Sequence, residues 1–92
     1  MEKRIKITVR GFVQGIGFRF FTKRMADEFG IKGFVENMYN GDVEAEAQAT
    51  PDLLNDFVSE LKIGPRGSAI TSVFVDEIPM SEEIQDEDFI IL

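Results

Sequence analysis

The spacing of apolar residues along this chain switches between two periods, and this switching limits the folds it can adopt. Alternation with a period of two indicates half-buried strands, whereas spacing near 3.6 indicates amphipathic helices. Alternation predicts strands at residues 4–13 and 43–49, and residues 31–39 and 69–78 also have the composition of strands. Helical spacing predicts helices from Phe18 to Gly30 and from Pro51 to Gly64, and a short apolar segment at 89–92 predicts a possible fifth strand.

The predicted order of elements is β-α-β-β-α-β. Asn40-Gly41 is typical of the turn of a hairpin between the second and third strands. Two right-handed crossovers around a hairpin predict an α+β fold, the ferredoxin-like sandwich, with an antiparallel sheet and both helices on one face. Because 92 residues are too few for a second hydrophobic core, we expect a single domain over residues 1–92.

The composition excludes several kinds of chemistry. The chain has no cysteine and no histidine, which removes disulfides, thiol nucleophiles, imidazole bases and most zinc sites. Any chemistry at a site in this chain is therefore expected to be simple. No apolar run approaches the roughly 18 residues of a membrane span, and no apolar signal segment follows Met1, so a cytoplasmic protein without a membrane partner is expected.

Charge is distributed unevenly along the sequence. The net charge of −7 argues against nucleic-acid binding, which requires a basic surface, and favours a monomer. Residues 1–50 carry a net charge of +1 and residues 51–92 a net charge of −8, so an anion site is expected in the first half. The acidic run Ser81–Asp88 lacks calcium-loop spacing and predicts a solvated loop. An RNA-binding sheet of the same topology is an alternative, but it would need exposed aromatic residues and a basic face.

The segment Gln14-Gly15-Ile16-Gly17-Phe18-Arg19 joins the first predicted strand to the first predicted helix through two glycines. Such a turn can direct successive backbone N–H groups into a concavity at a helix N-terminus, which favours anions. Arg19 adds a planar, permanently charged set of donors. Taken alone, the pattern fits a tight turn with a surface arginine equally well.

Two longer segments resemble a known family. Val9 to Arg19 is similar to the first signature of the acylphosphatase family, with Ile16 where valine is usual, and Gly33 to Val43 is similar to its second signature. The resemblance spans about residues 5 to 79. Two features depart from the family pattern, Glu36 in place of a basic or neutral residue and Ala49 in place of a glycine.

The resemblance implies an enzyme that hydrolyses the carboxyl–phosphate bond of small acyl phosphates with no metal and no cofactor. On that expectation Arg19 and Asn37 are the catalytic residues, Arg19 binding the phosphate and Asn37 positioning the water. The expected phosphate-binding residues are Gln14, Gly15, Ile16, Gly17, Phe18 and Arg19. The alternative is a module of the same fold that binds phosphate or carbamoyl phosphate, or serves regulation, without catalysis.

Overall fold

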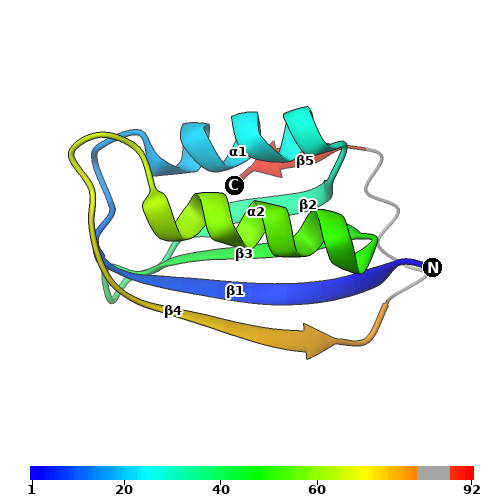
Figure 1. Ribbon diagram of the computed structural model, residues 1–92. Helices are drawn as coiled ribbons and strands as arrows, with labels where there is room; N and C mark the ends of the chain where they lie inside the picture. Colours follow the sequence, from blue (N-terminus) through cyan, green and yellow to red (C-terminus); the bar gives the residue numbers. More distant parts are fainter. Residues whose placement is uncertain (81–87) are drawn as a thin grey trace.

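The computed structural model describes residues 1–80 and 88–92. Its elements follow the predicted order (Figure 1). They are β1 (Lys3–Phe12), α1 (Phe18–Phe29), β2 (Lys32–Asn37), β3 (Val43–Ala49), α2 (Pro51–Ile63), β4 (Ala69–Ile78) and β5 (Phe89–Ile91). The acidic run from Ser81, predicted to be a solvated loop, lies outside the described residues except for Asp88.

The strands form one sheet in the order β4-β1-β3-β2-β5. The pairings of β1 with β3, β1 with β4 and β2 with β3 are antiparallel, as predicted. The short fifth strand is present, and it pairs with β2 in parallel, so that Val35 lies opposite Ile91. The sheet is therefore mixed at this one edge, where β5 lies beneath α1 (Figure 1).

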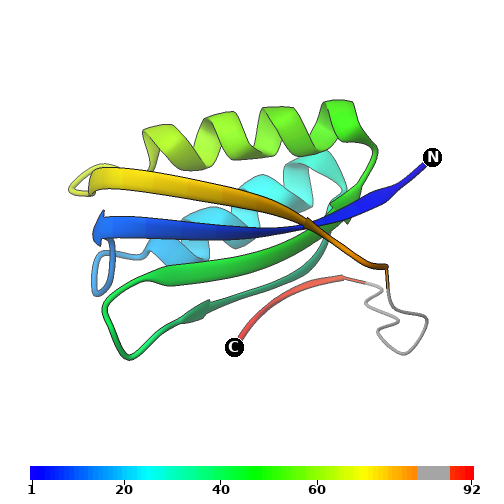
Figure 2. The same cartoon turned by 90° about the horizontal axis from the view of Figure 1, so that it is seen from below.

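Both helices pack on the same face of the sheet, and the other face is uncovered by helices (Figure 2). The alternating apolar residues of β1 and β3 point to the helices and are buried. From the helices, Phe18, Leu54, Phe57 and Leu61 complete this core, and Phe57 meets Phe89 of β5 edge-on at 6.0 Å between ring centroids. Burial of these side chains is the dominant force that holds the two layers together.

The hairpin between β2 and β3 is confirmed, but its turn is longer than the two residues that Asn40-Gly41 suggests. The Met38 N–H donates to the Asp42 carbonyl at 2.8 Å, and the Gly41 N–H donates to the Met38 carbonyl at 3.1 Å. Gly41 has a φ of 96°, and every described residue with a positive φ is a glycine. This is the geometry of a three-residue loop that ends in a glycine bulge. β2 therefore ends at Asn37 and not at Tyr39.

The described helices include none that is long and apolar enough to cross a membrane.

Candidate active site

The loop between β1 and α1 contains two glycines in left-handed conformations. Gly15 and Gly17 have φ angles of 77° and 80°, and Ile16 between them has a negative φ. Alternation of left- and right-handed residues turns successive N–H groups toward one point. A Cβ added at either glycine would meet no atom within 4 Å, so no other part of the described chain packs against that side of the two glycines.

The N-terminus of α1 opens onto this loop. Gly17 is the N-cap, and no side chain caps the helix; its first turn contains no acidic residue. The N–H groups of a first helical turn have no partner within the helix and carry the positive end of the helix dipole. The loop and the helix start together favour a bound anion.

Arg19 lies in the first turn of α1 and reaches the β5 edge of the sheet. Its Nη1 donates to the Leu92 carbonyl oxygen at 3.0 Å. The Leu92 N–H in turn donates to the Val35 carbonyl of β2 at 2.8 Å. The guanidinium is thereby held beside the strand that carries Asn37, two residues after Val35.

Asn37 is the last residue of β2, and its side chain is exposed. It lies two residues after the buried Val35, so strand alternation places it on the face that the helices cover. Glu36, which departs from the family pattern, falls on the opposite face, where its cross-strand neighbour is Glu44. The other departure, Ala49, is buried in the core opposite Lys3.

Gln14 connects the loop directly to the end of β2. Its Nε2 donates to the Met38 carbonyl at 2.8 Å and to the Asp42 carbonyl at 3.0 Å. Sequence reasoning placed Gln14 at the phosphate and did not predict this contact, because nothing in its spacing indicates a partner 24 and 28 residues away. With the side-chain nitrogen so engaged, the backbone of Gln14 is the part available to the loop.

An ion pair supports the hairpin from the uncovered face of the sheet. Arg10 Nε and Nη2 contact the two carboxylate oxygens of Asp42, each at 3.2 Å, and Asn40 Nδ2 lies 3.1 Å from Asp42 Oδ2. The hydrogen bond from Arg10 lowers the pKa of the Asp42 carboxyl, although burial acts in the opposite direction. The same hydrogen bond raises the pKa of Arg10. Both groups are therefore charged at neutral pH.

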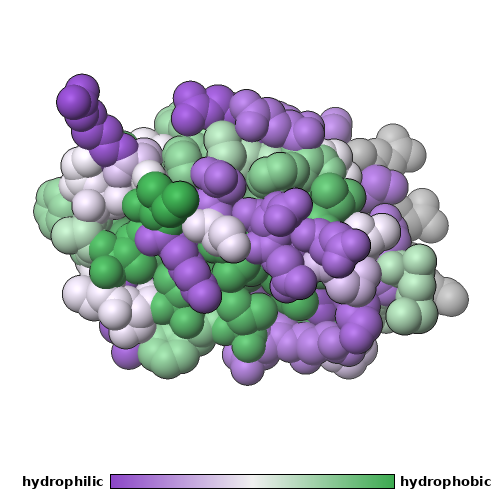
Figure 3. Space-filling model, viewed as in Figure 1, coloured by the Kyte–Doolittle hydropathy of each residue, from purple (hydrophilic) through white to green (hydrophobic). Residues whose placement is uncertain are grey.

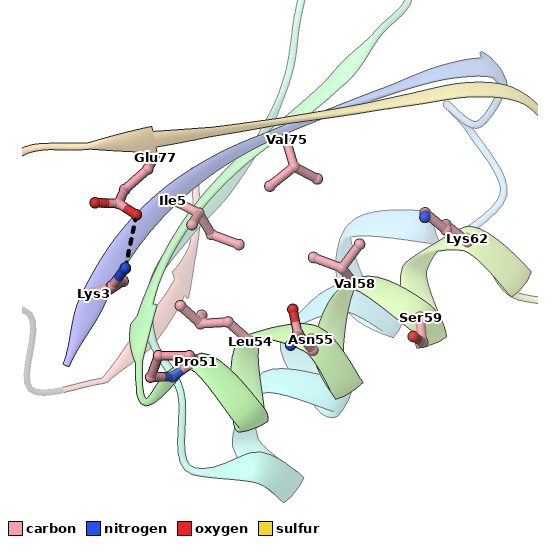
Figure 4. Close-up of a pocket in the computed structure, with 10 residues that line it drawn as sticks. All are labelled: Lys3, Ile5, Pro51, Leu54, Asn55, Val58, Ser59, Lys62, Val75 and Glu77. Carbon is pink, nitrogen blue, oxygen red and sulfur yellow. Dashed lines mark hydrogen bonds and ion pairs between the residues drawn. The ribbon is translucent and has the colours of Figure 1, made fainter. Parts of the chain in front are cut away.

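A separate groove of about 530 Å³ runs between α2 and β4. Apolar side chains gather along this side of α2 in the space-filling view (Figure 3), and Ile5, Leu54, Val58 and Val75 point into the groove (Figure 4). The ion pair of Lys3 with Glu77, at 3.2 Å, lies at one end. The residues lining the groove include none of the predicted site residues, and its apolar floor does not suit a phosphate group.

In the part of the chain that the structure describes, the carboxylate side chains do not gather into a group that could hold a metal. No group of three or more aspartate or glutamate side chains comes together there.

Comparison with known proteins shows which family this chain is similar to. The family model Acylphosphatase matches residues 5–91. The acylphosphatase of Bifidobacterium longum is 44% identical over 80 residues, which cover 87% of this chain and 82% of that protein. The crystal structure of acylphosphatase from Bacillus subtilis superimposes with a TM-score of 0.92 at 35% identity, covering 100% of this chain and 99% of that one.

A larger protein contains a similar domain. The crystal structure of full-length HypF in the phosphate- and nucleotide-bound form matches with a TM-score of 0.87 and 27% identity. The match covers 100% of this chain but only 12% of that one. The smaller relatives are matched over most of their own length, and with the family model they show that this chain belongs to the acylphosphatase family of hydrolases.

Proposed function

We propose that this chain hydrolyses the carboxyl–phosphate bond of small acyl phosphates, with the phosphate held by the loop at 15–19 and the water positioned by Asn37. The observation that carries the proposal is the pair of left-handed glycines, Gly15 and Gly17, at the uncapped start of α1, with Arg19 in the first helical turn. Hydrogen bonds tie both the loop and Arg19 to the backbone on either side of Asn37.

Phosphoryl transfer requires little covalent chemistry from a protein. Its loose transition state needs charge stabilised on the equatorial oxygens and a nucleophile held in line with the leaving group. Fixed N–H groups of the loop and the guanidinium of Arg19 would meet those oxygens without reorganising as charge develops. Arginine suits this role because its planar donors match two phosphate oxygens at once.

The Asn37 amide can hold a water molecule but cannot act as a strong base. Its carbonyl oxygen would accept a hydrogen bond from the water and direct a lone pair toward phosphorus. The water oxygen forms the new bond to phosphorus as the bond to the acyl oxygen breaks, and the electron pair leaves on the carboxylate. Both water protons remain on the dihydrogen phosphate product, so the leaving group needs no acid from the protein.

The first test is hydrolysis of acetyl phosphate by Arg19→Ala in the presence of a metal chelator. Loss of one fixed donor to a developing oxyanion costs about 100- to 1,000-fold in turnover, and we expect at least that loss here. Arg24→Ala is the matched control. Arg24 lies on the same helix, and its Cζ is 5.8 Å from the centroid of the Phe21 ring. Turnover above about a tenth of wild type in folded Arg19→Ala would contradict the assignment.

The second test separates water positioning from phosphate binding. In Asn37→Ala we expect a large fall in kcat with little change in the inhibition constant of inorganic phosphate, because the loop and Arg19 are intact. Asn55→Ala, an exposed asparagine on α2, is the control and should keep wild-type turnover. A loss of phosphate affinity in Asn37→Ala would instead make Asn37 a binding residue.

The likeness to full-length HypF, whose crystal structure is of a phosphate- and nucleotide-bound form, favours one other function, a module that binds phosphate without hydrolysis. The same loop would serve either purpose. Folded wild-type protein that binds inorganic phosphate but leaves acetyl phosphate intact would support this second function.

A further inference from the structure

The side chain of Gln14 joins two parts of the site that are far apart in the sequence. Gln14 directly precedes Gly15, so its own peptide begins the loop. Its Nε2 lies 2.8 Å from the carbonyl oxygen of Met38, the residue after Asn37, and 3.0 Å from the carbonyl oxygen of Asp42. One side chain thus contacts both ends of the turn that follows Asn37.

The orientation of the Gln14 amide follows from its partners. Both contacts are to backbone carbonyl oxygens, which can only accept hydrogen bonds, so the amide nitrogen must face them and both of its N–H groups are used. Each carbonyl also accepts a backbone bond, from Gly41 in the case of Met38 and from Met38 in the case of Asp42. Gln14 is thus an uncharged double donor that bonds both carbonyls from the start of the loop.

The hairpin does not depend on Gln14 for its own shape. Its backbone bonds, the Arg10–Asp42 pair and the Asn40 contacts with Asp42 fix the turn locally. What Gln14 adds is the position of this preformed turn relative to the loop at 15–19. The contact therefore joins the turn that follows Asn37 to the start of the loop.

We infer that Gln14 is a positioning residue that sets the alignment of the water on Asn37 with the phosphate in the loop. This inference rests on the proposed function of both groups. In-line attack is sensitive to small displacements, and a misplacement of about 1 Å can cost about 100-fold in rate. The role predicts a loss in kcat with phosphate binding retained.

The test is acetyl phosphate kinetics on Gln14→Met, which keeps the length of the side chain but removes both donors without adding charge. We expect kcat to fall by about 10- to 100-fold. We expect the inhibition constant of inorganic phosphate to change by less than about threefold. Gln48→Met is the matched control, because Gln48 lies in β3, contacts Glu2 and Arg4 and not the loop, and should keep wild-type kinetics.

Gln14→Leu provides a second uncharged variant, whose side chain cannot donate to the two carbonyls, and it should show the same split between kcat and phosphate affinity. Unchanged kcat in either folded variant overturns the inference, as does a parallel loss of kcat and phosphate affinity. If both variants fail to fold, Gln14 is a residue of the fold itself and the inference is overturned.

A double-mutant cycle with Asn37→Ala separates this inference from the proposed function. If Gln14 acts through Asn37, Gln14→Met should cost less than about threefold more in the Asn37→Ala background. A full additional loss there overturns the positioning role while leaving the proposed function intact. If Arg19→Ala and Asn37→Ala keep wild-type turnover, or the wild type has none, the proposed function itself fails and the inference fails with it.

Discussion

Gly17 and Gly30 cap the two ends of α1 in left-handed conformations, with φ of 80° and 68°. The Cβ of an alanine at either position would meet no atom within 4 Å, so either substitution would destabilise the fold through backbone strain and not through a steric clash. Such strain costs about 1–3 kcal/mol for a residue other than glycine. The two positions differ only in function, since Gly17 lies in the proposed phosphate loop.

We therefore expect Gly17→Ala and Gly30→Ala to lower the free energy of unfolding by similar amounts. Only Gly17→Ala should weaken inhibition by inorganic phosphate, by about tenfold or more, because it reorients the fixed donors of the loop. Urea unfolding and inhibition assays on both variants measure the two effects. Equal phosphate affinity in the two variants would contradict the assignment of the loop.

The carboxyl group of Asp42 makes the free energy of unfolding depend on pH in the acidic range. Its pKa in the folded chain is lowered, chiefly by the hydrogen bond from Arg10, so the folded state binds this proton less readily than the unfolded state does. The stabilisation is fully present above the unfolded pKa, near 4, and is lost as the pH falls through the lowered folded value.

Asp42→Asn should consequently be less stable than wild type at neutral pH and should lose less of its unfolding free energy as the pH falls from about 5 to about 2. Urea unfolding at a series of pH values tests this. Asp27→Asn is the control, since its exposed pair with Lys23 at 3.2 Å is of a kind that contributes little. Parallel pH profiles for wild type and Asp42→Asn would refute the role of the pair.

At the scale of elements, hydrophobic spacing predicted β1, β3 and the two helices, which bury one regular face, while composition predicted β4 and β5; together they gave the order of the described elements. Hydrophobic spacing predicted less well which individual side chains are fully buried, because that depends on the residues packed against them. Spacing placed Phe18, Phe21, Met25 and Phe29 on the buried face of α1, but its fully buried residues are Phe18, Thr22 and Ala26. The small residues allow the helix to approach the sheet closely, while the larger ones flank the contact and are partly buried.

The same limit applies to the site and to the uncovered face of the sheet. The glycines and Arg19 are recognisable because local backbone geometry and charge suffice to suggest an anion site. Arg4, assigned by alternation to the polar face, is nonetheless 2% exposed and bonds Glu46 Oε1 at 2.9 Å. Its burial, like the contact of Gln14 with the hairpin, depends on cross-strand register, which local sequence does not encode.

β5 is a short element that supports the site. Lys23 Nζ donates to the Phe89 carbonyl at 2.8 Å, Gly33 N–H to the Asp88 carbonyl at 3.1 Å, and Arg19 to the Leu92 carbonyl at 3.0 Å. Phe89 is 1% exposed and anchors the strand in the core against Phe57. Loss of this anchor should release the partner that holds Arg19.

Phe89→Ala should therefore lower the free energy of unfolding by about 3–5 kcal/mol and, in the folded fraction, weaken phosphate binding. Ile90→Ala is the matched control, because Ile90 is 47% exposed and neighbours the anchor in the same strand. Thermal unfolding and phosphate titration below the transition measure the two effects. Unaltered phosphate affinity in folded Phe89→Ala would show that Arg19 is oriented without β5.

At the scale of the whole molecule, the proposed anionic substrate must approach a chain of net charge −7. The molecule measures 34 × 24 × 20 Å. Electrostatic interactions extend about 30 Å at 0.01 M salt but only about 8 Å at 0.15 M, so the whole charge acts on the substrate only at low salt. Contacts within the loop are much shorter and are screened less.

We therefore expect kcat/KM for acetyl phosphate to rise as potassium chloride increases from about 0.01 M to about 0.15 M, because long-range repulsion is screened before the contacts with Arg19 are. Neutralising the exposed Glu28 and Asp56 as Glu28→Gln and Asp56→Asn removes two negative charges, from −7 to −5. This double variant should show a smaller rise at unchanged kcat. A kcat/KM that instead falls with salt in both proteins would mean that the positive field of the loop and Arg19 outweighs the net charge of the chain along the approach path.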